Sequence, residues 1–210
     1  YVPNRIAGAL ASQSVKLVGV VVPSLSSFVF PEVLSGLSQG LAESPLKPVI
    51  GVTGYDLDEE EEVIREMLSW RPSGLVVAGL EHSDTSRALL SAAGCPVVEI
   101  MDVDGDPVAH CVGISHIAAG RKMAEEILAR GYSRIGFIGT KMPQDFRAQK
   151  RLYGFIAGLH DQGLDLAACE LYAGQSSIET GSQLTAAMLA DTPDLQCIYY
   201  SSDVMSVGGY

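Results

Sequence analysis

The sequence lacks the glycine-rich loops with which nucleotide-dependent enzymes bind phosphate. The stretch after the first predicted strand reads VVPSLSS, and neither G-x-G-x-x-G nor G-x-x-x-x-G-K-[ST] occurs in the 210 residues. The zinc-protease motif H-E-x-x-H is also absent, and the four histidines stand at unrelated positions. We therefore expect the chain to be neither an enzyme nor a cofactor-binding protein.

Long apolar runs are missing as well. No run reaches the roughly 18 residues that a membrane-spanning helix needs. Pro3, Asn4 and Arg5 interrupt the opening stretch where an export signal would be apolar throughout. With 47% hydrophobic and 19% charged residues, the composition is that of a soluble globular α/β protein. We expect a cytoplasmic location and no membrane partner.

Cysteine is scarce, and its spacing excludes two kinds of site. Cys95, Cys111, Cys169 and Cys197 are far apart and form no C-x-x-C pair. That spacing argues against zinc binding and against a redox pair. We predict buried free thiols, which suit a reducing compartment, and no metal site.

Positive charge is outweighed by negative charge, at 14 Lys and Arg against 25 Asp and Glu, for a net charge of −11. This balance argues against nucleic-acid binding by the body of the chain. The first sixteen residues are the exception, with Arg5 and Lys16 and no acid. The acidic run at 56–62 could suggest a cation site, but consecutive carboxylates point around a helix. We predict a solvated first helical turn there.

The stretch VGISHIAAGRKMAEEILARGYSRIGFIG organises the chain. Ala119, Met123 and Ile127 recur at four-residue spacing, with Ala124 and Leu128 beside them, which predicts the apolar face of a helix. Ser115 is suited to cap its first turn, and Gly131 to end it. A buried strand follows, so we interpret this stretch as a βαβ crossover between two similar α/β halves.

Strands and helices alternate along the rest of the chain, which predicts a parallel sheet covered by helices on both faces. Besides the crossover helix, we expect strands at 17–22, 48–52, 74–78, 96–100, 111–114, 134–138, 169–172 and 196–200, and helices at 31–43, 58–69, 83–93, 147–162 and 177–190.

Polar side chains follow the ends of these strands, where open parallel sheets bind their ligands. With two such halves, we expect the binding site in a cleft between them. Hydroxyls, carboxylates, an arginine and an aromatic ring suit a polyhydroxylated ligand. The candidates in these loops are Ser26, Ser27, Phe30, Tyr55, Asp102, Ser115, His116, Asp145, Arg147, Ser202 and Asp203.

The first thirteen residues read as a short helix behind a tether. Pro3 suits a first helical turn with Asn4 beside it as a polar cap, and Ala7 and Leu10 fall on one face. Such a helix is too short to persist alone in water. Either the segment is a frayed terminus that docks on the body, or it folds when it meets a partner.

These residues carry a resemblance to the LacI/GalR family of bacterial transcriptional repressors. YVPNRIAGALASQSVKLVGVVVPSLSS resembles the hinge helix and first strand of that family, and ISHIAAGRKMAEEILARGYSRIGFIG resembles its crossover. RLYGF and SSDVMSVG match later family motifs. GYDLDEEEEVIREMLSW and PVVEIMD are similar to the gluconate-type repressors within the family.

The resemblance implies a class I periplasmic-binding-protein-like sensor made of two doubly wound subdomains. It would be a homodimer that binds a small sugar or sugar acid in its cleft and thereby changes its affinity for operator DNA. The implied domains are a hinge helix and linker at 1–13, an N-terminal subdomain at 14–114 and a truncated C-terminal subdomain at 115–210. The family's DNA-binding headpiece is absent from this sequence.

The resemblance also implies which residues of this chain occupy the family's effector-binding and hinge-helix positions. Arg151 matches the effector-binding arginine, and Asp102 matches a carboxylate at the mouth of the cleft. Ser202 and Asp203 fall on an Asn-Asp pair, where serine shortens the polar reach. The remaining matches are Ser27, Phe30 and Arg147 as effector-lining residues, and Asn4, Ala7 and Leu10 in the hinge helix, where Leu10 would wedge into the minor groove.

Two alternatives stay open at this point. A periplasmic sugar-binding protein would share the fold and the cleft, but it would need an export signal. For the ligand, Arg147 and Arg151 together could hold the carboxylate of a sugar acid such as gluconate. A simpler arrangement has Arg151 fork onto two hydroxyls while Arg147 faces solvent.

Overall fold

A computed structural model describes residues 15–25, 29–141, 143–174 and 176–210. The contacts within the chain divide it into two compact units, one up to Gly113 and one from Ile114 onward. The predicted boundary lay one residue later, between 114 and 115. Asn4, Ala7 and Leu10 of the predicted hinge helix, and Ser27 of the predicted effector site, lie outside the described residues.

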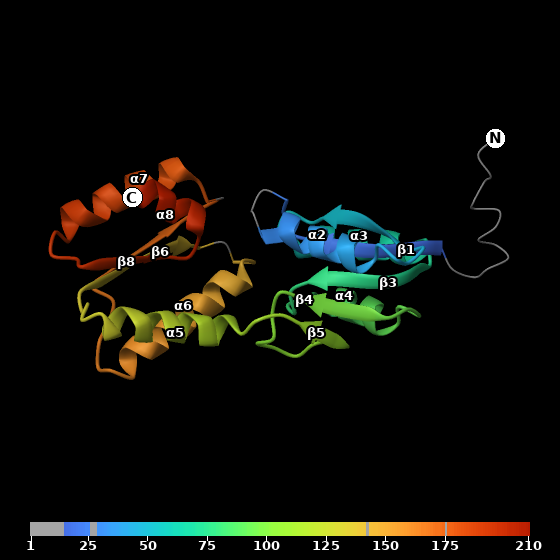
Figure 1. Cartoon of the computed structure of the whole chain (residues 1–210), viewed down its shortest axis with the longest axis horizontal. Helices are drawn as coiled ribbons and strands as arrows, with labels where there is room; N and C mark the ends of the chain where they lie inside the picture. The colour runs from blue at the N-terminus through green and yellow to red at the C-terminus, as the bar shows by residue number, and fades with distance from the viewer. Residues whose placement is uncertain (1–14, 26–28, 142, 175) are drawn as a thin grey trace. The chain divides into compact units, whose positions relative to one another are not determined.

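Unit 1 contains a five-stranded parallel sheet in the order β2-β1-β3-β4-β5 (Figure 1). Helices connect β1 to β2, β2 to β3 and β3 to β4, whereas the segment 101–109 between the parallel strands β4 and β5 contains no helix. The chain reverses its winding direction beside β1, which places a topological switch point between β1 and β3. The strands are β1 (Val15–Val22), β2 (Lys47–Val52), β3 (Pro72–Ala78), β4 (Val97–Ile100) and β5 (His110–Val112).

Both faces of the unit 1 sheet are covered. Successive side chains of β1 point to opposite faces, so Val20 and Val22 join one core cluster and Val21 joins the other. Helix α2 (Val29–Gly40) packs on the first face, whereas α3 (Leu57–Ser69) and α4 (Asp84–Ser91) pack on the second. A strand buried on both faces needs a continuous apolar run, which is why β1 reads VKLVGVVV.

Unit 2 repeats this plan around three parallel strands in the order β7-β6-β8. One core cluster lies between the sheet and α5 and α6, and the other lies between the sheet and α7 and α8. Figure 1 shows these two helix pairs on opposite sides of β6 and β8. The elements are α5 (His116–Ala129), β6 (Ile135–Thr140), α6 (Phe146–His160), β7 (Ala168–Tyr172), α7 (Ile178–Asp191), β8 (Cys197–Tyr200) and α8 (Asp203–Gly209).

The predicted fold class, a parallel α/β architecture with two doubly wound sheets, is confirmed. Three local predictions need correction. The buried face of α5 runs through His116, Gly120, Ala124 and Ile127, not through Met123, which is exposed. Helix α8 was missed, because its seven residues are too few for a periodic pattern. The cysteines are free as predicted, but none is fully buried, and Cys169 is exposed.

Among the described residues, no helix combines the length and the apolar character needed to cross a bilayer.

Candidate effector site

In unit 1, Asp102 lies two residues after the end of β4 and is fully buried. Its Oδ1 accepts a hydrogen bond from the backbone N–H of Asp104, at 2.8 Å. Phe30, in the first turn of α2, is also buried, and its ring belongs to the core cluster with Val20 and Val22. Phe30 therefore has a structural role in the core, and its stacking against a ligand stays a prediction.

Two residues at the same edge of the sheet have an unusual backbone. Tyr55, after β2, and Met101, after β4, adopt the left-handed region with φ of 66° and 78°. Non-glycine residues pay about 1–3 kcal/mol for such conformations, and these cluster at binding sites. Both residues follow the carboxyl ends of strands, where ligands bind in sheets of this class, and Met101 is adjacent to Asp102 in the chain.

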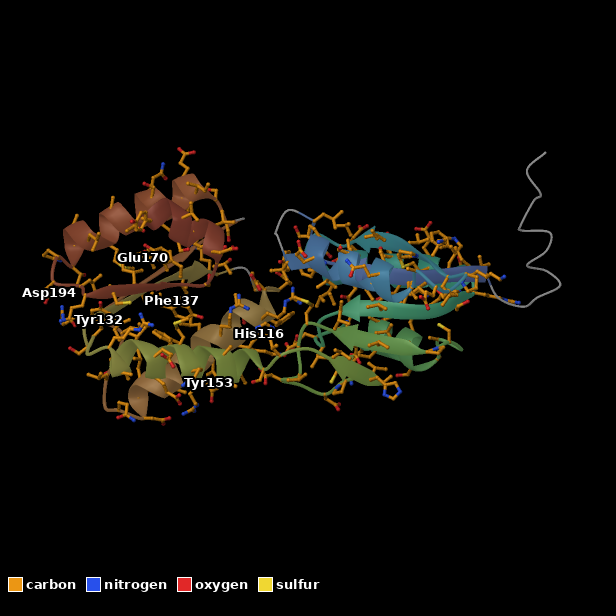
Figure 2. The ribbon with its side chains drawn as sticks, viewed as in Figure 1. His116, Tyr132, Phe137, Tyr153, Glu170 and Asp194 are labelled. Carbon is orange, nitrogen blue, oxygen red and sulfur yellow. The ribbon has the colours of Figure 1, made fainter. Side chains whose placement is uncertain are left out.

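In unit 2, Arg151 of α6 is held by two neighbours from other elements. Its Nη1 donates to Nδ1 of His116, the first residue of α5, at 3.1 Å, and its Nη2 donates to the backbone carbonyl of Ser201, directly after β8, at 3.2 Å. Figure 2 shows His116 at the end of unit 2 opposite the one with Tyr132 and Asp194. The guanidinium thus lies at the carboxyl edge of the unit 2 sheet.

Three other residues predicted from the sequence lie in the same helix as Arg151 or directly follow Ser201 in the chain. Ser202 follows Ser201 in the chain, and although it occupies the N-cap position of α8, its hydroxyl makes no capping hydrogen bond. Asp203 accepts from the N–H of Val204 at 2.8 Å and is exposed. Arg147 lies one helical turn before Arg151 in α6.

A neighbouring aromatic side chain is affected by the same arginine. Burial raises the pKa of the Tyr199 phenol, whereas the positive charge of Arg151 acts in the opposite direction. The Tyr199 ring packs against Phe155 with centroids 4.6 Å apart. Both rings belong to the core cluster of unit 2 that contains α5 and α6.

From the sequence, Arg151 is predicted to bind the effector, and His116 is a candidate that could instead support only the start of its helix. The structure shows the N-cap of α5 to be Ser115, whose hydroxyl accepts from the N–H of Ala118 at 2.9 Å. Ser115 was correctly predicted as that cap. The pairing of His116 with Arg151 joins residues 35 positions apart, and no local pattern signals it.

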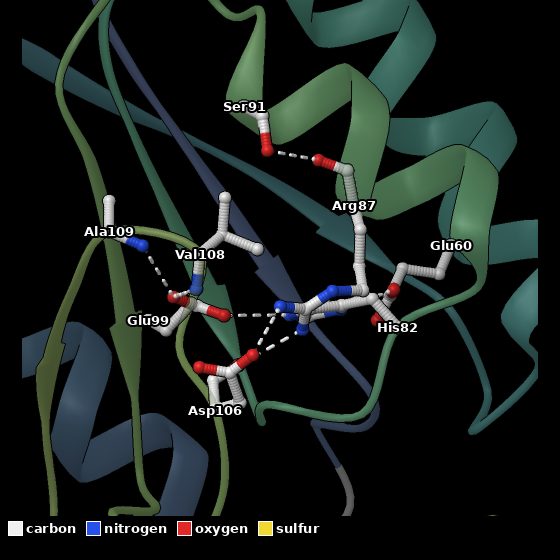
Figure 3. A network of polar contacts seen from close by, with 8 residues as sticks. All are labelled: Glu60, His82, Arg87, Ser91, Glu99, Asp106, Val108 and Ala109. Atoms are coloured by element: carbon white, nitrogen blue, oxygen red, sulfur yellow. Dashed lines mark hydrogen bonds and ion pairs between the residues drawn. The ribbon is translucent and has the colours of Figure 1, made fainter.

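A second polar cluster, in unit 1, was missed entirely (Figure 3). His82, whose side chain is fully buried, places Nδ1 2.7 Å from Oε1 of Glu60 and Nε2 3.3 Å from Oε1 of Glu99, the latter contact lacking hydrogen-bond alignment. Oε2 of Glu99 accepts from the N–H groups of Val108 and Ala109 at 2.7 and 3.2 Å. The cluster links α3, the loop after β3, β4 and the segment before β5.

This cluster corrects the prediction for the acidic run. Asp56 caps α3 by accepting from Asp58 and Glu59, which are exposed as expected. Glu60, by contrast, is buried against His82. The described residues contain no group of three or more His, Cys, Asp or Glu arranged to hold a metal ion.

Comparison with known proteins connects this arrangement to a family. The family model described as periplasmic binding proteins and sugar binding domain of LacI family matches residues 15–210. The HTH-type transcriptional regulator GntR of Pseudomonas aeruginosa is 36% identical over 213 residues, which cover 99% of this chain and 60% of that protein. The chain spans about three fifths of the length of the curated relatives it matches, 60 to 62%.

Solved structures similar to this chain belong to the same family. A LacI-family transcriptional regulator from Silicibacter pomeroyi is 57% identical with a TM-score of 0.95, covering 100% of this chain and 63% of that one. The transcription regulator GntR from Chromobacterium violaceum is 34% identical with a TM-score of 0.85, covering 92% and 70%. Each of these relatives is named as a regulator of transcription rather than as an enzyme. The chain belongs to the family of periplasmic binding proteins and LacI sugar-binding domains, as a LacI-family effector-binding domain similar to GntR.

Proposed function

We propose that the chain is the ligand-sensing part of a LacI-type transcriptional regulator, and that it binds a small sugar acid of the gluconate type. The observation that carries this proposal is the guanidinium of Arg151, held at the carboxyl edge of the unit 2 sheet by an imidazole nitrogen and a backbone carbonyl. Neither partner is a carboxylate, so the positive charge of Arg151 is not neutralised by them.

An arginine in this state favours an anionic ligand over a neutral sugar. Hydrogen bonds between a guanidinium and a carboxylate are shorter and stronger than those to hydroxyls, and they form in pairs. The resemblance of GYDLDEEEEVIREMLSW and PVVEIMD to gluconate-type repressors points to the same class of ligand. The carboxylate of the effector would pair with Arg151, and its hydroxyls would bind to neighbouring side chains.

We extend the proposed effector contacts to both units of the chain. Asp102, buried beside the strained Met101, would accept hydrogen bonds from effector hydroxyls. Ser202, with a hydroxyl that does not cap α8, would donate one. The other proposed contacts are Ser27, Phe30, Arg147 and Asp203.

The DNA-binding role concerns the whole protein. We propose that it acts in the cytoplasm as a homodimer and that its hinge helix, with Asn4, Ala7 and Leu10, contacts operator DNA together with a headpiece absent from this sequence. The acidic net charge of −11 supports this division of labour, because attraction to phosphate must then come from outside the body of the chain. The relatives named as transcriptional regulators disfavour the alternative of a periplasmic sugar-binding protein.

Calorimetry with gluconate, phosphorylated gluconate, ribose and galactose tests the ligand class. We expect a sugar acid to bind, and the two neutral sugars to bind at least about 10-fold more weakly, since they lack the charged partner for Arg151. Arg151→Ala should remove most of this preference. Equal affinity for gluconate and galactose, or binding of neither acid, would overturn the proposal.

A further inference from the structure

Arg151 is restrained before any ligand arrives. Arginine has five N–H donors and no acceptor. One donor on Nη1 is used by His116 and one on Nη2 by Ser201, so the bonds to described residues leave three of the five. The two contacts come from different elements, α5 and the β8–α8 connection, and together they fix the plane of the guanidinium.

The contact also fixes the protonation state of the imidazole. Because arginine cannot accept a hydrogen bond, Nδ1 of His116 must be the acceptor and therefore carries no proton. His116 is thus neutral while it holds Arg151, with its proton on Nε2. A protonated ring would set two positive donors against each other.

Packing between α5 and α6 places His116 beside Arg151. An added Cβ at Gly120, one turn after His116, would collide with the backbone carbonyl of Arg151. An added Cβ at Gly154 would likewise collide with the backbone carbonyl of Ile117. The two glycines let the helix backbones touch, and the short distance brings the His116 ring within reach of the guanidinium.

We propose that His116 is a positioning residue for effector binding: as a neutral acceptor it orients Arg151 so that the remaining donors and the full charge of the guanidinium engage the carboxylate of a sugar acid. This inference rests on the proposed function. It assigns to His116 a role beyond supporting the helix start, which Ser115 already caps.

Three substitutions separate this role from a merely structural one. Asparagine places an oxygen near the position of Nδ1, whereas glutamine places its oxygen near that of Nε2, and leucine provides no acceptor. By calorimetry with gluconate, we expect His116→Asn to bind within about 3-fold of the wild type. His116→Gln and His116→Leu should bind at least about 10-fold more weakly, as the loss of a hydrogen bond to a charged group predicts.

The controls address folding and the parent hypothesis. His160→Leu removes a histidine of α6 that pairs with Asp165 away from Arg151, and it should leave gluconate affinity unchanged. Thermal unfolding shows whether each variant is folded. If His116→Leu does not fold, the positioning role is tested by the gluconate affinities of His116→Asn and His116→Gln alone. Equal affinities for the Asn and Gln variants would overturn the positioning role while the proposed function stands. A wild-type protein that binds no sugar acid would overturn both.

Discussion

His82 is a buried histidine between two carboxylates, and its environment shifts the pKa of its imidazole in two opposite directions. Burial lowers the pKa of its imidazole, but the hydrogen bond and charge of Glu60, together with the charge of Glu99, outweigh burial, so that the pKa is raised above 6.5. The imidazolium is thus favoured in the folded protein. The contacts of His82 with Glu60 and Glu99 link α3, the loop after β3 and β4 (Figure 3).

The raised pKa predicts how the stability of unit 1 varies with pH. A group whose pKa is higher in the folded state stabilises fully below its unfolded pKa, and this contribution is lost as the pH rises through the folded pKa. We expect the free energy of unfolding of wild type, relative to His82→Gln, to fall as the pH rises from below 6.5, by at most about 1.4 kcal/mol per pH unit.

Urea denaturation at a series of pH values measures this difference. His110→Gln, which replaces an exposed histidine of β5, serves as the matched control and should track the wild type at every pH. A constant difference between wild type and His82→Gln across the series would contradict a raised pKa.

Residue-level prediction from sequence worked where the interaction is local. Ser115 caps a helix three residues ahead, and that signal is contained in its immediate neighbours. His82 and Glu99 lie 17 positions apart and meet only through the fold, while Glu60 reads as one more acid in an acidic turn. Such contacts depend on strand order, which no short window contains.

At the scale of elements, the pairing of α5 with α6 depends on glycine. Gly154 faces the backbone of Ile117, which cannot move aside in the way a flexible side chain can. Gly36, on the exposed face of α2, offers the opposite environment, because a Cβ added there would meet no atom within 4 Å.

Replacing each glycine with alanine should have opposite effects. Gly154→Ala should destabilise unit 2 by about 1–3 kcal/mol or more, because overpacking forces the helices apart. Gly36→Ala should stabilise unit 1 by about 0.5–1 kcal/mol, since alanine loses less conformational freedom in a helix. Chemical denaturation followed at both units provides the measurement, and a neutral Gly154→Ala would refute the close helix contact.

The same contact explains why the sequence misplaced part of the buried face of α5. The hydrophobic pattern correctly included Ala124 and Ile127 but wrongly included Met123, because the helix that packs against α5 requires small residues at the crossing. Gly120 carries almost no hydrophobic signal, although it is buried. Strand positions were predictable because buried parallel strands are continuously apolar.

At the scale of the whole molecule, the proposed regulator must couple two separable events. The proposed effector contacts centre on Arg151, whereas the proposed operator contact is Leu10, within the first thirteen residues. A ligand shifts an equilibrium only by its differential affinity for two states. Removal of Arg151 should therefore weaken binding of the effector without abolishing binding of DNA. Removal of Leu10 should weaken binding of DNA without changing affinity for the effector.

A pair of variants in the whole protein tests this coupling. Leu10→Ala should weaken operator binding by about 10-fold or more, because an apolar wedge of this size contributes roughly 1.5–3 kcal/mol when buried. Its affinity for gluconate should stay at the wild-type value. Arg151→Ala should show the reverse, with operator binding kept and the response to gluconate lost. Fluorescence anisotropy with operator DNA, titrated with gluconate, measures both quantities.

Two results would contradict this coupling. If Arg151→Ala responds to gluconate as the wild type does, the arginine is not part of the sensing step. If Leu10→Ala binds operator as tightly as the wild type, the hinge does not insert Leu10 into the minor groove.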